Sequence, residues 1–112
     1  LQRTLAGLRA SHQGDLSGDL ARSVHGELVS RVRREHRGVA DLGVKRGPFY
    51  VLFLSSMPSI LVEVGFLTNR TEARRLRSDD YAALLAKSIA AGIFHYRDHH
   101  SPVVARTRVP QP

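Results

Sequence analysis

The sequence predicts an α/β fold, with helices packed on a sheet, on the basis of three observations. Apolar residues recur at helical spacing in the first third of the chain and again in the last third. Between these regions, Phe49–Leu54 is a continuous apolar run of strand length, typical of a strand covered on both faces. Ile60–Val64 then follows the period-two pattern of a strand.

The predicted sheet is too small to stand alone. The chain has 112 residues, enough for one domain, and two strands form only a marginal sheet in water. The chain begins at Leu1 and its only methionine is Met57, which indicates a natural N-terminus upstream. We therefore expect residues 1–97 to be an incomplete domain that lacks its N-terminal strands, unless a partner completes the sheet.

Two helices are predicted before residue 38. The first covers Leu1–Arg9, and the turn and cap residues of Ser11–Asp15 predict a break after it. A long helix then runs from Leu16 to a stop at Gly38. The basic cluster Arg31–Arg37 suits the negative end of the helix dipole, so a solvated helix end is favoured over a nucleic-acid patch. The apolar stripe of the long helix comprises Leu16, Leu20, Ala21, Val24, Leu28, Val29 and Val32.

The two predicted strands place one carboxylate in an apolar setting. Only Ser55–Ser59 separate them, so they should be antiparallel if they are neighbours. Glu63 shares a strand face with Leu61 and Gly65, and the glycine leaves open space beside the acid. An ionised Glu there costs several kcal/mol unless a cation or hydrogen-bond donors meet it. Two interpretations remain open: a catalytic carboxylate, or a buried Glu satisfied by backbone donors or an arginine.

The last third of the chain is predicted to be helical. Asn69 with Glu72 resembles a capping box that opens a short helix through Leu76. Ser78 or Asp79 starts the last helix, and Gly92 allows it to pack closely. Residues 98–112 are rich in proline and predicted to be a disordered tail. The stripe of the last helix comprises Tyr81, Leu84, Leu85, Ile89, Ile93 and Tyr96.

Composition restricts the function only weakly. The net charge of +7, with most basic residues being arginine, favours polyanionic partners but does not select one. No apolar run approaches the ~18 residues of a membrane span. His95 and His99 have the i,i+4 spacing of a metal pair, but they lie near a helix end without an accompanying His-Glu-x-x-His pattern, so no metal site is expected there.

The segment Pro58–Asn69, followed by Glu72 and Leu76, resembles the signature of the zinc-dependent N-acetylmuramoyl-L-alanine amidases of bacterial cell walls. The resemblance extends over about Leu1 to Tyr96, including Gly43-Val44-Lys45 before the predicted strands. It implies helices on a twisted mixed sheet. It also implies that Glu63 is the catalytic general acid/base. Phe53 departs from the family pattern, where many members carry a polar or basic residue.

The resemblance further implies a zinc ion held by two histidines and one glutamate, which activates water for attack on the amide joining N-acetylmuramic acid to L-alanine. The chain has no counterpart of these ligands, so they are expected upstream, and the chain alone should be inactive. Peptidoglycan is then the partner and the location is periplasmic or extracellular, whereas the sequence does not identify a regulatory protein. Two alternative functions are kept beside the amidase: a non-catalytic wall-binding remnant of an amidase, and an arginine-rich nucleic-acid-binding module.

Overall fold

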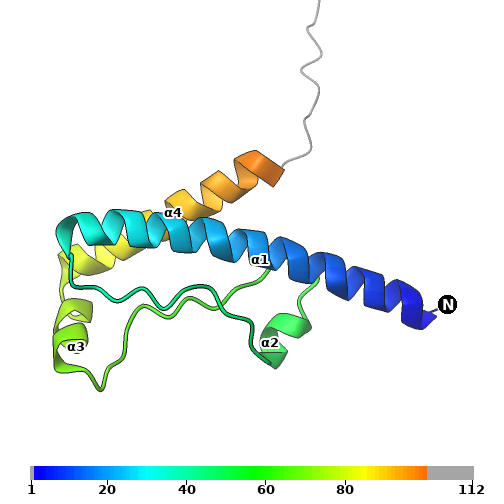
Figure 1. Cartoon of the computed structure of the whole chain (residues 1–112), viewed down its shortest axis with the longest axis horizontal. Coiled ribbons are helices and arrows are strands. Elements are labelled where there is room, and N and C mark those ends of the chain that lie inside the picture. The colour runs from blue at the N-terminus through cyan, green and yellow to red at the C-terminus, as the bar shows by residue number, and fades with distance from the viewer. Residues whose placement is uncertain (1, 101–112) are drawn as a thin grey trace, which may run out of the picture.

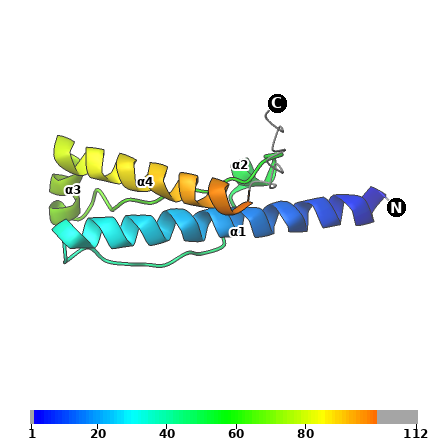
Figure 2. The ribbon, with the colours of Figure 1, turned by 90° about the horizontal axis from the view of Figure 1, so that it is seen from above.

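The computed structural model describes residues 2–100, and within this range the chain is helical rather than α/β. The helices are α1 (Gln2–Glu35), α2 (Tyr50–Phe53), α3 (Arg70–Leu76) and α4 (Asp79–His100). Helices α1 and α4 lie side by side and antiparallel, with α3 below the C-terminal end of α1 (Figures 1 and 2). Two extended segments, residues 39–49 and 57–65, run antiparallel between that end and α2 (Figure 1).

The predicted mixed sheet is therefore wrong for residues 2–100. Phe49–Leu54 forms the single turn of α2, in which the amides of Leu52 and Phe53 both donate to the carbonyl of Phe49. Ile60–Val64 is extended but forms no strand ladder. An isolated pair of strands is marginal in water, so without further strands the apolar run satisfies its amides within its own turn instead.

Helix α1 also differs from the prediction, because it is continuous through Ser11–Asp15. No proline interrupts it, and a glycine such as Gly14 costs a helix only about 1 kcal/mol relative to alanine. Its apolar stripe is confirmed, since Val24 and Val32 are buried and the other members are half-buried.

The starts of α3 and α4 follow the predicted caps, except that the Glu72 half of the capping box does not form: the Asn69 amide donates to the Phe66 carbonyl, and Glu72 accepts from the Phe66 amide. The side chain of Asn69 accepts from the amides of Thr71 and Glu72 at 3.0 and 3.1 Å. Ser78 Oγ accepts from the Tyr81 amide at 3.3 Å, one turn into α4. Helix α4 continues through His100, three residues into the predicted tail, and residues 101–112 lie outside the described part of the chain.

The core lies where α4 crosses α1. Val24 is 1% exposed, and Gly92 faces it so closely that a Cβ on Gly92 would lie 2.4 Å from Val24 Cα. Ser88 is fully buried and donates its hydroxyl to the Leu84 carbonyl at 2.7 Å. Tyr81 packs edge-on against His36, and burial raises the pKa of its hydroxyl. The close packing predicted for Gly92 is thus against a helix.

Candidate functional site

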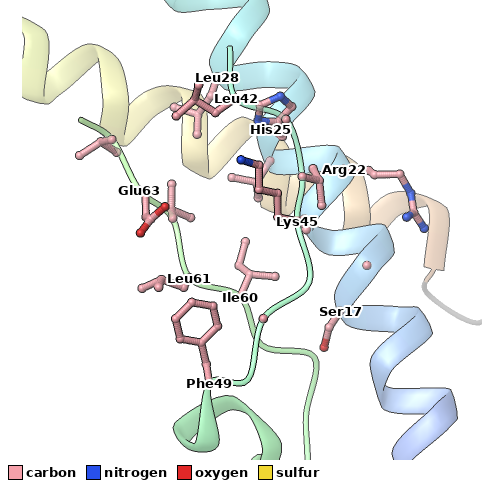
Figure 3. Close-up of a pocket in the computed structure, with 18 of the residues that line it drawn as sticks. Ser17, Arg22, His25, Leu28, Leu42, Lys45, Phe49, Ile60, Leu61 and Glu63 are labelled. Atoms are coloured by element: carbon pink, nitrogen blue, oxygen red, sulfur yellow. The ribbon is translucent and has the colours of Figure 1, made fainter. Parts of the chain in front are cut away.

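A cleft of about 1550 Å³ lies between α1 and the two extended segments. Its lining is largely apolar, with Leu42, Phe49, Ile60 and Leu61 among the lining residues. In Figure 3, Phe49, Ile60 and Leu61 lie near one another at one end of the cleft, and Leu42 lies beside Leu28 of α1 at the other. Glu63 lies on one of the extended segments and contributes to the same lining.

Each extended segment is fastened to α1 by a polar contact. Ser17 Oγ on α1 accepts from the Ser59 amide at 3.0 Å, just before Ile60. His25 Nε2 lies 2.7 Å from Asp41 Oδ1, and the same carboxylate oxygen accepts from the Gly43 amide at 2.9 Å. These contacts hold both walls of the cleft against one rigid helix.

The Glu63 side chain is exposed, and within the described residues it makes no hydrogen bond or ion pair. The alternative of a buried Glu held by backbone donors or an arginine is therefore wrong for this structure. The desolvation cost expected for a buried acid does not arise either. Its carboxylate is open to a ligand that enters the cleft.

The space predicted beside Glu63 is not open. A Cβ on Gly65 would lie 3.4 Å from Leu76 Cδ1 and 3.6 Å from Glu72 Cβ, so α3 fills that side. Glu72 itself accepts from the Phe66 amide at 2.7 Å. Its carboxylate thus holds the turn that follows Gly65, whereas Glu63 has no polar partner among residues 2–100.

Lys45 also lines the cleft; the family resemblance included it but predicted no role for it. It lies on the segment facing Glu63 (Figure 3), is exposed, and has no carboxylate within ion-pair distance in the described residues. Only its position in the family-like Gly43-Val44-Lys45 motif could have pointed to it. Lys45 and Glu63 thus lie on opposite walls of the cleft, each without an ion-pair partner in the described residues; Arg46 and Asp15, which also line the cleft, are likewise unpaired.

Metal ligands are not gathered at this site. Within residues 2–100, no group of three or more His, Asp or Glu side chains could hold a metal ion. The rings of His95 and His99 lie tilted with centroids 4.1 Å apart, but His99 Nδ1 contacts the His95 carbonyl at 2.7 Å and no third ligand from the described residues joins them. The described residues therefore do not form a zinc site by themselves.

Two carboxylates should make stability depend on pH. Hydrogen bonds from Arg22 and then His100 lower the pKa of Asp19. The Gly43 amide and then His25 do the same for Asp41. Because a lowered pKa lets the unfolded chain bind more protons, these contacts stabilise the fold above pH ~4 and are lost as the pH falls below it.

We expect the free energy of unfolding, measured by urea denaturation from pH 7 to pH 3, to decrease at the acid end. The double variant Asp19→Asn/Asp41→Asn should be less stable at pH 7 and should show a shallower decrease. An unchanged pH dependence in that variant would mean that neither contact contributes to the acid sensitivity.

Comparison with known proteins supplies the deciding observation. A sequence model described as N-acetylmuramoyl-L-alanine amidase matches residues 8–95, which is most of the chain. The chain belongs to this amidase family. The match includes both extended segments, Glu63 and the core of α1 and α4.

Curated relatives of this amidase-family chain include named N-acetylmuramoyl-L-alanine amidases. The protein YqiI of Bacillus subtilis, described as uncharacterized, is 38% identical over 90 residues, which are 80% of this chain and 41% of YqiI. The N-acetylmuramoyl-L-alanine amidase LytC of the same organism is 35% identical over 86 residues, 77% of this chain and 16% of LytC. AmiC of Neisseria meningitidis is 39% identical over 70 residues, 62% of this chain and 16% of AmiC.

The amidase-family chain spans less than half the length of these relatives. No solved structure matches it significantly. Within the described residues, no helix is long and apolar enough to cross a membrane.

Proposed function

We propose that the protein carrying this chain hydrolyses the amide bond between N-acetylmuramic acid and L-alanine in peptidoglycan. Membership of the amidase family supports the reaction class. The observation that carries the proposal is Glu63, an exposed carboxylate without a polar partner in the described residues, on the wall of a cleft and inside the most family-like segment.

Glu63 is proposed as the general acid/base. It takes a proton from the attacking water as the new C–O bond forms at the lactyl carbonyl carbon of muramic acid. It then gives that proton to the amide nitrogen as the C–N bond breaks. The products are a lactyl carboxylate on the glycan and a free amino group on L-alanine. An exposed carboxylate on a cleft wall can reach both water and substrate.

Zinc is proposed as the cofactor of the whole protein, with its ligands outside this chain. The described residues do not form a metal cluster, so the chain alone should neither require zinc to fold nor hydrolyse peptidoglycan. Hydrolysis of peptidoglycan requires a location in the cell envelope, and we propose that it is periplasmic or extracellular.

The proposal is tested by the products of peptidoglycan digestion. Purified full-length protein should release intact stem peptides that carry a free N-terminal L-alanine, identified by mass spectrometry. The 112-residue chain, assayed in parallel, should release none. Cleavage within the stem peptide or the glycan would contradict the proposal. Binding of peptidoglycan without any release would favour the non-catalytic wall-binding remnant instead.

A further inference from the structure

Three arginines form a line on the outer face of α3. Arg70, Arg74 and Arg77, here called the arginine stripe, are all exposed and follow the i, i+4, i+7 spacing of one helix face. At about 1.5 Å of rise per residue, the stripe extends about 10 Å along α3 and its C-cap residue. The half-buried Glu72, Ala73 and Leu76 occupy the other side of the helix.

None of the three stripe arginines has a carboxylate within ion-pair distance in the described residues. Three exposed arginines elsewhere have carboxylate partners, namely Arg22 with Asp19, Arg31 with Glu27 at 2.8 Å, and Arg97 with Asp98 at 2.8 Å. Arg34, Arg37 and Arg46 are exposed and, like the stripe, have no carboxylate partner in the described residues. The stripe therefore presents open guanidinium groups. A guanidinium fork matches the oxygens of a phosphate group and can bind two of them at once.

The positive charge continues from α3 onto the C-terminal end of α1. The guanidinium of Arg75 reaches Gly38, with Nη2 3.8 Å from the position of a Cβ on that glycine. Figure 1 shows α3 directly below this end of α1. Arg37 follows the last residue of α1 by two positions. Of the nearby acids, Glu72 already binds the Phe66 amide, Asp79 and Asp80 lie in the first turn of α4, and Glu35 is the last residue of α1.

We propose that the arginine stripe binds the phosphodiester backbone of an anionic cell-wall polymer. An extended polymer with regularly spaced phosphates can contact all three arginines of the stripe, whereas a ligand with a single carboxylate can pair with only one of them. No aromatic residue lies between residues 70 and 77, so base stacking, which dominates binding of single-stranded nucleic acid, has no platform within the stripe. The choice of a wall polymer rests on the proposed function, whereas the phosphate chemistry rests on the stripe alone.

Two triple variants of the 112-residue chain test the proposal at equal net charge. Arg70→Gln/Arg74→Gln/Arg77→Gln removes the stripe, and Arg22→Gln/Arg31→Gln/Arg97→Gln removes three arginines that have carboxylate partners. Glutamine has nearly the helix propensity of arginine, and circular dichroism checks that both variants keep their helices. Binding to labelled poly(glycerol phosphate) is measured by fluorescence anisotropy over a range of salt concentrations.

We expect the stripe variant to bind at least ~10-fold more weakly at low salt. The slope of log K against log salt concentration should decrease in magnitude by about 2, because each of the three lost phosphate contacts contributes about 0.7. The matched control should stay within about threefold of the unmodified chain. Equal losses in the two variants would overturn the proposal, because net charge alone would then explain binding.

Two further measurements test which class of phosphate-bearing molecule the stripe binds and whether binding requires guanidinium groups. Tighter binding, at the same salt, to a single-stranded oligonucleotide or to anionic lipid vesicles than to poly(glycerol phosphate) would overturn the wall-polymer assignment. The variant Arg70→Lys/Arg74→Lys/Arg77→Lys keeps the positive charge but loses the two-pronged guanidinium groups. We expect its affinity to lie between those of the unmodified chain and the glutamine variant. None of these assays measures hydrolysis, so a failure here is distinct from a failure of the proposed amidase activity.

Discussion

Replacing Gly92 with alanine is expected to produce the largest loss of stability, because the new Cβ would lie 2.4 Å from Val24 Cα and 2.9 Å from Val24 N. Backbone atoms cannot rotate away as a side chain can, so α1 and α4 must separate. Overpacking typically costs 1–3 kcal/mol, and a clash with backbone atoms is expected at or above the upper end of that range. The gain of about 1 kcal/mol in helix propensity offsets only part of this cost. We expect a net loss of about 2 kcal/mol and a decrease in Tm on the order of 10 °C.

Gly26→Ala is the matched control for this prediction. Gly26 also lies within a helix, but it is exposed and a Cβ there would meet nothing within 4 Å. The same chemical change should therefore stabilise the chain by up to about 1 kcal/mol. Thermal unfolding followed by circular dichroism measures both variants. Equal shifts in the same direction would contradict the close crossing of α1 and α4 at Gly92.

Glu63→Gln is expected to produce the largest loss of activity in the full-length protein. The amide cannot accept and return a proton, and removal of a general acid/base typically lowers the rate 10²–10⁴-fold. Stability should change little, since the Glu63 side chain is exposed and makes no hydrogen bond in the described residues. The rate is measured as stem-peptide release, and Tm is measured on the same preparation.

The sequence predicted the helical parts of the fold well. The apolar stripe of α1, the Asn69 cap and the start of α4 depend on local spacing and capping, which neighbouring residues along the chain determine. The break at Ser11–Asp15 was wrong for a related reason: turn-forming residues weaken a helix, but in α1 they do not end it.

The predicted sheet failed because strands depend on partners distant in sequence. An apolar run such as Phe49–Leu54 does not by itself specify whether its amides bond to a neighbouring strand or within one turn. In the structure they bond within the turn of α2. The alternating Ile60–Val64 segment kept its extended backbone without a ladder.

The candidate site was only partly predictable. The family-like motif selected Glu63, but not its exposure, nor the cleft that it lines. The position of Lys45 across the cleft from Glu63 could not be derived from periodicity, because the two residues are 18 positions apart in the sequence. The same holds for the contact between Ser17 and the Ser59 amide, which joins residues 42 positions apart. Such pairs become visible only when the chain is folded.

The most direct test of the whole account compares Glu63→Gln with Glu72→Gln in one peptidoglycan-hydrolysis assay on the full-length protein. Both residues line the cleft, but Glu72 binds the Phe66 amide, and a glutamine oxygen can still accept that hydrogen bond. We predict that stem-peptide release falls at least ~100-fold in the Glu63 variant and stays close to the unmodified rate in the Glu72 variant. Comparable release by the Glu63 variant and the unmodified protein would contradict the assignment of Glu63 as the proton-transfer group.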